Sequence, residues 1–200
     1  MNEAATPKSA SDTLPSVEKL KMLPGKTLVI GPSRSGKSYF SLAFKQAGLN
    51  VVDTDKDTEL IKWRNDLGGE PVVPPPVTDE AWLASNHFTI QPEELEQFLA
   101  GCGDVIMFAH CWNIMDVIGQ FDRVAYMSLP SDELERRLQI RRPDHSRISS
   151  SAELEFHRYR HQERSCQAMK RGITFINATV APIEFYNQLR KVPSRAEDNK

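Results

Sequence analysis

The sequence predicts a single α/β domain built around a mostly parallel β-sheet. Between about residues 25 and 190, short β-branched or apolar runs alternate with segments of helical periodicity. That alternation is typical of parallel strands joined by crossover helices. The chain has 200 residues, 40% of them hydrophobic and 26% charged, which suits one globular domain. We expect a flexible leader at 1–22, a folded domain at 23–191 and a polar tail at 192–200.

Five apolar runs predict the strands, at 26–31, 50–53, 104–109, 123–128 and 173–177. The first helix is expected at about 36–47, because Phe40, Ala43, Phe44 and Ala47 share one helical face. Gly48 then stands just past its end.

Four further helices are predicted, at about 92–100, 131–141, 151–171 and 181–190. Pro92 fits a first helical turn, and Ser131 is the expected N-cap of the helix that follows it. The widest gap between strands is 56–103, which we interpret as an insertion. Its prolines at 70–78 exclude a helix or a central strand there, and Trp63 and Trp82 are expected to pack it.

The bulk properties exclude several classes of protein. A net charge of −2 gives no global attraction to nucleic acid or to an anionic membrane. No apolar run approaches the roughly 18–20 residues of a membrane span, and the N-terminal segment carries no signal-type apolar core. The three cysteines, Cys102, Cys111 and Cys166, show no paired spacing, so we expect a reduced, cytoplasmic protein.

Residues 31–38, GPSRSGKS, fit the phosphate-binding pattern G-x-x-x-x-G-K-[ST] between an apolar strand and an amphipathic helix. Gly31 and Gly36 permit a loop whose N–H groups point at a polyphosphate, at a helix N-terminus that favours anions. Lys37 can reach the β- and γ-phosphates, and the Ser38 hydroxyl can bind Mg²⁺. The motif therefore predicts a nucleotide site, with these loop residues as its ligands: Gly31, Ser33, Arg34, Ser35, Gly36, Lys37, Ser38 and Tyr39.

Three acids follow the second predicted strand in the stretch VVDTDKD, at 51–57. Asp53 and Asp55 would emerge at the carboxyl end of that strand, where open α/β sheets bind their ligands. Carboxylates at this edge can hold Mg²⁺ or accept a proton from an attacking hydroxyl. Asp57 is expected only to cap a following helix.

GPSRSGKS, then VVDTD, then RRP at 141–143 resemble the small P-loop kinases of the shikimate, gluconate and nucleoside monophosphate kinase group. The closest pattern is shikimate-kinase-like. The resemblance implies a three-layer α/β/α P-loop NTPase fold with five parallel strands in the order 2-3-1-4-5. It also implies a substrate-binding insertion at 56–103 and an arginine-bearing lid at 141–150.

The same resemblance assigns roles residue by residue. Asp53 becomes the Mg²⁺-linked acid, Asp55 the catalytic, substrate-facing acid, and Arg141 and Arg142 the catalytic lid arginines. Arg164 takes the place of a substrate-binding arginine on the helix after the lid. The segment NATVAP, at 177–182, occupies the place of an adenine-contacting loop, which includes Asn177 and Thr179.

The chain also departs from that group. FAHCWN, at 108–113, stands where shikimate kinases carry a glycine triplet, and 88–103 contains no arginine to hold a substrate carboxylate. The third strand ends before His110 rather than in the usual acid of a second nucleotide motif.

Two alternatives stay open at His110 and Trp112. In the first, His110 orients or deprotonates an acceptor and Trp112 stacks on a flat substrate. In the second, His110 is only a histidine at the end of the strand and Trp112 only a packing residue. His157 and His161 stand four apart on a helix but lack a third metal ligand in the sequence, which favours a surface pair.

Residues 136–171 contain ten Lys/Arg and four Asp/Glu. This segment could be a phosphate-clamping lid, a track for a nucleic-acid backbone or a solvated helix face.

The leading hypothesis is an ATP- and Mg²⁺-dependent kinase acting on a hydroxyl or phosphate of a small molecule or nucleotide. Two alternatives remain: a kinase for a nucleic-acid hydroxyl, such as a 5′ end or a hydroxymethylated base, and a nucleotide-binding ATPase or switch without an acceptor.

Overall fold

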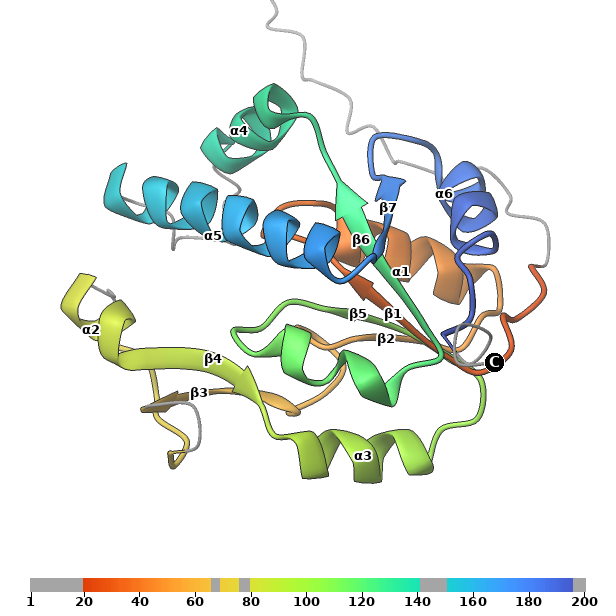
Figure 1. Cartoon of the computed structure of the whole chain (residues 1–200), viewed down its shortest axis with the longest axis horizontal. Helices are drawn as coiled ribbons and strands as arrows, with labels where there is room; N and C mark the ends of the chain where they lie inside the picture. The colour runs from red at the N-terminus through yellow and green to blue at the C-terminus, as the bar shows by residue number, and fades with distance from the viewer. Residues whose placement is uncertain (1–19, 66–68, 76–79, 141–150, 196–200) are drawn as a thin grey trace, which may run out of the picture.

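The computed structural model describes residues 20–65, 69–75, 80–140 and 151–195. Five parallel strands form the central sheet (Figure 1). They are β1 (Lys26–Ile30), β2 (Val51–Asp53), β5 (Val105–Ala109), β6 (Arg123–Ser128) and β7 (Thr174–Asn177). All five expected strands are present, each within a residue or two of its predicted bounds.

The strands lie in the order β2-β5-β1-β6-β7. The expected order, written 2-3-1-4-5, needs correcting because two strands that we did not predict intervene in the numbering. These are β3 (Ile61–Asn65) and β4 (Asn86–Ile90), which pair with each other in a separate antiparallel hairpin. Without the hairpin in the count, β5 is the third strand of the sheet and lies between β2 and β1.

Successive side chains along the strands point alternately into two separate hydrophobic cores, one on each face of the sheet. Val29, Phe108 and Met127 face one core, which also contains Phe44 of the first helix and Phe185 of the last. Leu28, Met107 and Tyr126 face the other core. Because both faces of the sheet are covered, the strands read as continuous apolar runs rather than as alternating ones.

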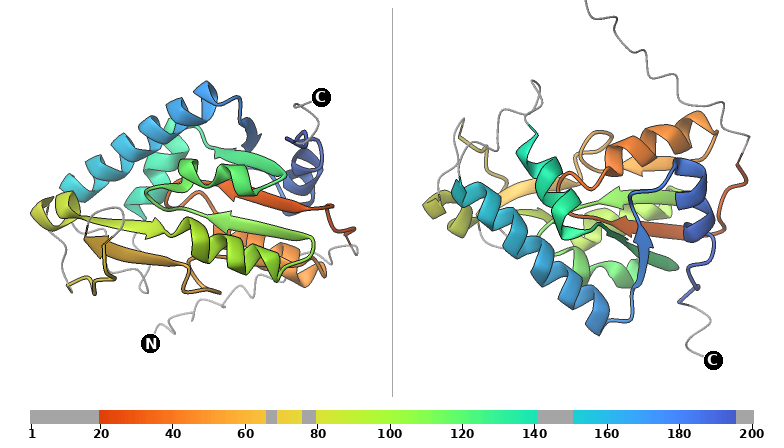
Figure 2. Two further views of the ribbon diagram at one scale, coloured as in Figure 1. Left: turned by 60° about the horizontal axis from the view of Figure 1, so that its bottom comes forward. Right: turned by 90° about the horizontal axis from the view of Figure 1, so that it is seen from above.

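Helices cover both faces of this sheet. The first core holds α1 (Lys37–Gln46), α4 (Ser131–Gln139) and α6 (Pro182–Leu189), and the second holds α3 (Pro92–Ala100) and the end of α5 (Ser151–Lys170). Figure 2 shows α1 and α5 on opposite sides of the sheet.

One helix end matches its prediction and another differs from it. Gly48 follows α1 with a φ of +84°, as expected of the residue after a helix. The N-cap of α4 is Pro130 rather than Ser131, with no side-chain hydrogen bond, and α4 ends at Gln139.

The insertion carries more structure than its sequence indicated. It contains α2 (Glu80–Ser85), β3, β4 and α3, and Figure 1 shows the hairpin and α2 reaching away from α6. Trp63 packs against Trp82 and Phe88, with ring centroids 4.8 and 5.4 Å apart, so both tryptophans pack the insertion. Two short 3₁₀ helices, η1 (Ile114–Asp116) and η2 (Ile118–Gln120), follow β5.

Chain segments near both ends of the domain are packed. Leu20 and Met22 contact the first core, and the Tyr186 hydroxyl donates to the carbonyl of Lys21. Val192 is buried, and the backbone N–H of Arg195 donates to the Asp122 carbonyl. Within the described ranges, no helix is long and apolar enough to cross a membrane.

Candidate functional site

The glycine-rich loop joins β1 to α1 at the carboxyl edge of the sheet. Gly36 has a φ of +101°, which favours glycine, and Arg34 is the single non-glycine residue of the described ranges with a positive φ, at 63°. Gly31 is required for a different reason. A Cβ there would lie 2.5 Å from Ser35 Oγ and 2.9 Å from Met127 Sδ, so the loop can approach β6 only without a side chain.

Lys37 is folded back onto this loop. Its Nζ donates to the carbonyls of Gly31 at 3.2 Å and Pro32 at 3.1 Å, and the residue is 6% exposed. Burial lowers the pKa of Lys37, and the negative charges of Asp55 and Asp53 oppose that effect. The ammonium group is therefore held by weak carbonyl acceptors that an anionic ligand can replace.

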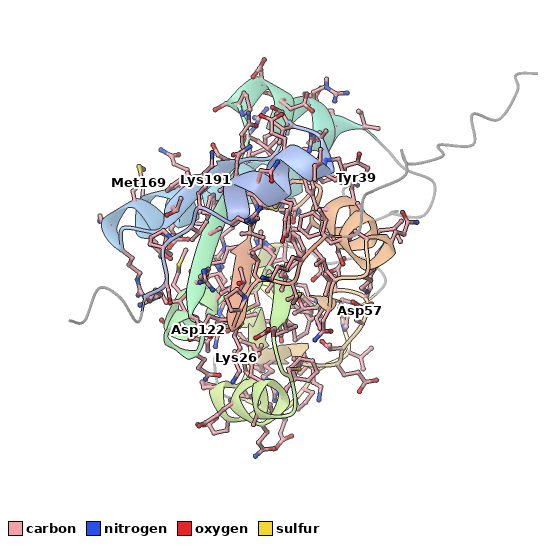
Figure 3. The ribbon with its side chains drawn as sticks, turned by 90° about the vertical axis from the view of Figure 1, so that its right-hand side faces the viewer. Lys26, Tyr39, Asp57, Asp122, Met169 and Lys191 are labelled. Atoms are coloured by element: carbon pink, nitrogen blue, oxygen red, sulfur yellow. The ribbon has the colours of Figure 1, made fainter. Side chains whose placement is uncertain are left out.

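A cleft of about 870 Å³ opens beside the loop. Its walls contain nine of the predicted site residues: Ser33, Arg34, Gly36, Lys37, Ser38, Tyr39, Asp55, His110 and Thr179. The other walls include Arg136 and Arg137 of α4, Ile140 just after it, His157 of α5, and Val180. These residues lie in the segments 136–171 and 177–182, which the sequence singles out, but they were not predicted individually as site residues. Tyr39, labelled in Figure 3, is 48% exposed on α1 at this cleft.

The three acids at and after the end of β2 have different environments. Asp53 is 2% exposed, and its Oδ1 accepts the N–H of Asp55 at 3.1 Å. Asp55 opens into the cleft, where loss of solvent raises the pKa of its carboxyl; Lys37 works against that rise and Asp53 adds to it. A raised pKa is what a carboxylate needs if it is to accept a proton.

Asp57 does not cap a helix, because a hairpin rather than a helix follows it. Its Oδ2 accepts the backbone N–H of Asp53 at 2.6 Å and forms an ion pair with Lys45 of α1. Asp57 therefore holds the turn that presents Asp53 and Asp55.

The donor set fits a magnesium ion bound together with phosphates. Asp53 Oδ2 is buried and has no hydrogen-bond partner among the described residues. Ser38 lies on the wall of the cleft, next in sequence to Lys37. No cluster of three or more His, Cys, Asp or Glu side chains suited to a metal occurs in the described part of the chain. Mg²⁺ in proteins is commonly held by one or two carboxylates together with substrate phosphates. Asp53, which does not line the cleft, and Ser38, which does, are the two residues that would hold it here.

Two histidines border the cleft as neutral groups. Burial, with the nearby charges of Lys37 and Arg164, holds the pKa of His110 well below its usual range. Burial and the charges of Arg34 and Lys37 lower the pKa of His157 to about 4. His161, four residues on, instead contacts the Tyr126 hydroxyl through Nδ1 at 3.1 Å, so the two histidines face different neighbours.

Trp112 is held between two side chains. The Arg160 guanidinium carbon lies 3.0 Å from the centre of the indole ring, and His87 stacks on Trp112 with centroids 4.0 Å apart. The structure therefore shows two packing partners for the Trp112 ring, whereas stacking of this ring on a flat substrate stays a prediction. The long-range contact from β4 was not readable from the sequence.

The segment after β5 is tied to the insertion and to α5. The Trp112 N–H donates to the Phe88 carbonyl at 2.6 Å, and the Asn113 amide exchanges two hydrogen bonds with the backbone of Ile90, at 2.7 and 3.0 Å. Arg164, 4% exposed, donates from Nη2 to the Trp112 carbonyl. The predicted substrate arginine thus borders the 110–113 segment but does not line the cleft.

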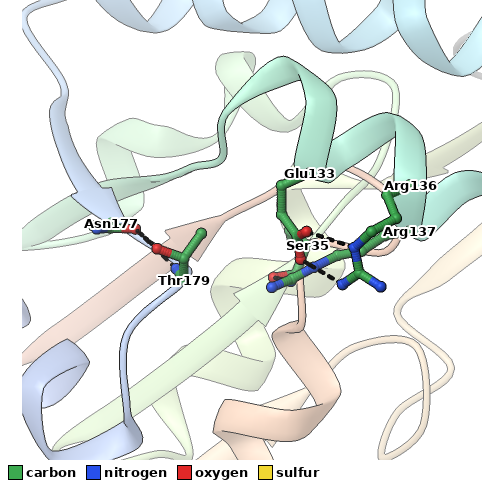
Figure 4. A network of polar contacts seen from close by, with 6 residues as sticks. All are labelled: Ser35, Glu133, Arg136, Arg137, Asn177 and Thr179. Atoms are coloured by element: carbon green, nitrogen blue, oxygen red, sulfur yellow. Dashed lines mark hydrogen bonds and ion pairs between the residues drawn. The ribbon is translucent and has the colours of Figure 1, made fainter.

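Helix α4 is fastened to the phosphate-binding loop by two arginines. Arg137 Nη1 donates to the Ser35 carbonyl at 2.9 Å, and Arg34 Nη1 donates to the Ile140 carbonyl at 3.1 Å (Figure 4 shows the first). Glu133 accepts from both Arg136 and Arg137, which lowers the pKa of Glu133 to about 2. The sequence shows two arginines in the last turn of α4, but it does not show that Arg137 contacts the phosphate-binding loop. Arg141, Arg142 and the expected lid at 141–150 lie outside the described residues.

The loop after β7 has its own internal order. Asn177 Oδ1 accepts from the Thr179 N–H at 2.8 Å and from its hydroxyl at 2.7 Å (Figure 4). Thr179 and Val180 line the cleft, whereas Asn177 fixes the turn behind them.

The fold and the loop define an α/β protein of the P-loop class. No family model matches the chain, and no curated protein matches it significantly. Solved structures similar to it include a gluconokinase from Sinorhizobium meliloti 1021, at 15% identity and TM-score 0.44, covering 84% of this chain and 91% of that one. A shikimate kinase from Bacteroides thetaiotaomicron has 15% identity and TM-score 0.47, covering 84% of this chain and 96% of that one.

Proposed function

We propose that the protein is an ATP- and Mg²⁺-dependent kinase that transfers a phosphoryl group to an acceptor hydroxyl or phosphate. One observation carries the proposal: Lys37 of the phosphate-binding loop and the raised-pKa carboxyl of Asp55 face the same cleft. A phosphate-binding group and a proton acceptor in one cleft are two of the parts that phosphoryl transfer uses.

On the donor side, the chain supplies positive charge and backbone donors. The N–H groups of residues 33–38 would hold the β- and γ-phosphates at the start of α1, and Lys37 would exchange its carbonyl acceptors for phosphate oxygens. Arg34, Arg136 and Arg137 line the same cleft and would neutralise charge on the transferred group. Asp53 and Ser38 would hold Mg²⁺, which neutralises phosphate charge when it is bound.

On the acceptor side, Asp55 would accept the proton of the attacking hydroxyl. The acceptor oxygen forms a bond to the γ-phosphorus as the bond to the β–γ bridging oxygen breaks, and ADP leaves. His110, kept uncharged by its surroundings, would orient the hydroxyl as a hydrogen-bond partner. Arg164 would steady the acceptor site through the Trp112 carbonyl.

The test is transfer from γ-labelled ATP to a panel of acceptors: nucleosides, nucleotides, sugar acids and DNA with hydroxymethylated bases. Lys37→Ala is expected to abolish transfer with the thermal unfolding temperature nearly unchanged. Lys191→Ala removes an equivalent charge from an exposed position outside the cleft and should keep full activity. Undiminished transfer by Lys37→Ala would overturn the proposal.

One observation favours a second candidate, an ATPase or switch without an acceptor. β5 ends in Ala109 and is followed by His110, where a carboxylate would ordinarily help to hold Mg²⁺. This candidate requires slow ATP turnover that no member of the acceptor panel accelerates, whereas the kinase requires stoichiometric labelling of an acceptor.

A further inference from the structure

A second cavity, of about 360 Å³, lies between α5 and the segment that follows β5. We call it the α5 groove. One wall is the face of α5 formed by Arg160, Arg164 and Gln167, which recur every three or four residues and so share one side of the helix, together with Arg171 just after its end. The other wall is Trp112 to Asp116. The groove is separate from the nucleotide cleft, because no residue lines both.

The groove is lined by more positive than negative charge. Arg160, Arg164, Lys170 and Arg171 face Asp116 and Glu163, a balance of four cations to two anions. Glu163 is engaged by Arg160 at 3.0 Å, while Lys170 and Arg171 at the outer end are exposed to solvent. An incoming anion therefore meets the unmatched cations first.

Arg164 gives the groove a buried donor as well as charge. The residue is 4% exposed, and its Nη1 has no hydrogen-bond partner within the described part of the chain. A buried guanidinium N–H without a partner is costly, and an anion that accepts from it removes that cost. Planar guanidinium groups are well matched to phosphate oxygens.

The groove also adjoins the proposed acceptor site. Trp112 forms its inner wall, and His110, two residues earlier, lines the nucleotide cleft. Along α5 the groove spans Arg160 to Arg171, roughly 16 Å at the helical rise. That length accommodates more than one phosphate of an extended chain.

We propose that the α5 groove binds a phosphate ester of the acceptor, and that the acceptor is therefore a phosphorylated molecule whose hydroxyl reaches Asp55. The identity of the acceptor rests on the kinase function proposed above, whereas binding of phosphate by the groove does not. The phosphate can come from a mononucleotide or from the backbone of a nucleic-acid strand, and the experiment separates these sources.

The experiment measures binding of a fluorescein-labelled single strand of about ten nucleotides, a length typical of such sites, by anisotropy. A non-hydrolysable ATP analogue and Mg²⁺ are present throughout, so that the phosphate-binding loop is occupied. Salt is varied from about 50 to 200 mM, because phosphate contacts make affinity fall with salt. Thymidine monophosphate and thymidine serve as competitors with and without a phosphate.

The variant pair offers a close control. Lys170→Ala/Arg171→Gln removes two cations at the end of α5, and Arg190→Gln/Lys191→Ala removes the same two residue types just after α6. Figure 3 labels Met169 of α5, which precedes the first pair in sequence, and Lys191 of the second pair, which follows α6. Arg171 also donates to the Met115 carbonyl, so Gln167→Glu is added as a variant that changes groove charge while leaving that bond in place.

We expect Lys170→Ala/Arg171→Gln to weaken strand binding about tenfold and to reduce the salt slope by about 1.4, the value for two contacts on a single strand. Gln167→Glu should also weaken it, and the α6 pair should remain within about twofold. If the strand binds weakly, a labelled mononucleotide replaces it as the probe. Displacement of this probe by thymidine monophosphate but not by thymidine would show that the groove takes the phosphate of a mononucleotide.

Equal weakening by both charge pairs, or no phosphate-dependent binding of either probe, would overturn the proposal. Binding of a fluorescent ATP analogue is measured on separate samples of the same protein preparations, with Mg²⁺ but without the non-hydrolysable analogue and the labelled strand. Its loss, with groove binding intact, would count against the kinase function alone.

Discussion

The guanidinium of Arg137 donates from Nη1 to the backbone carbonyl of Ser35 at 2.9 Å, across 102 residues of sequence. The bond joins the last turn of α4 to the centre of the phosphate-binding loop, and Glu133 holds the same guanidinium from the other side. Arg34 makes the reverse connection, from the loop to the carbonyl of Ile140. The position of α4 and the shape of the loop therefore depend on each other.

Replacing Arg137 by alanine should weaken ATP binding by about tenfold, the effect of losing one charge-assisted hydrogen bond. Arg136→Ala is the matched control, since Arg136 lines the same cleft but its side chain is 61% exposed and contacts Glu133 of its own helix rather than the loop. Titration with a fluorescent ATP analogue measures both variants. Equal losses would mean that charge in the cleft, rather than the link to Ser35, sets the affinity.

Asp55→Asn should lower acceptor turnover by about a hundredfold, within the range known for a general base, with ATP affinity little changed. The pKa of Asp55 is raised, and the carboxylate form is the active one. Wild-type turnover should therefore rise with pH through a value above the ordinary 3.8 and then level off.

The pH dependence of turnover should disappear in Asp55→Asn. Asp57→Asn provides the contrast, because Asp57 supports the turn from outside the cleft: it should reduce thermal stability more than it reduces turnover. A wild-type pH profile retained in Asp55→Asn would assign the proton transfer to another group.

Gly31→Ala should disrupt the phosphate-binding loop, because the new methyl group would lie 2.5 Å from Ser35 Oγ and 2.9 Å from Met127 Sδ. Overpacking of this kind costs about 1–3 kcal/mol of stability, and the loop should also lose ATP affinity. Gly103→Ala, where nothing lies within 4 Å of the added carbon, is the control and should behave as wild type. Chemical denaturation and nucleotide titration report the two effects.

The protein should lose stability as the pH falls from about 6.5 toward 4. The pKa of His157 is about 4 in the folded protein because of burial and the charges of Arg34 and Lys37, so between these values the unfolded chain binds a proton that the folded one does not. His157→Gln should flatten this part of the pH–stability curve measured by urea unfolding. An unchanged slope would show that other groups carry the acid sensitivity.

The amino-acid sequence by itself determined what depends on neighbouring residues. The five strands, α1 with Gly48 behind it, and the motif GPSRSGKS with its flanks follow from local periodicity and glycine backbone freedom. The placement of Asp53 and Asp55 at a strand end follows too, because Asp53 ends the apolar run of β2 and Asp55 comes two residues later. These features require only chain geometry within a few residues.

The tertiary structure decided the contacts that join distant segments. The β3–β4 hairpin, the enclosure of Trp112 between Arg160 and His87, and the turn of Asp57 back toward Lys45 depend on which surfaces meet after the sheet forms. The link from Arg137 to Ser35 is of the same kind. The sequence gives the type of each side chain, but the partner that the side chain contacts depends on how the folded chain packs. A local sequence pattern therefore does not predict a contact between residues about a hundred positions apart.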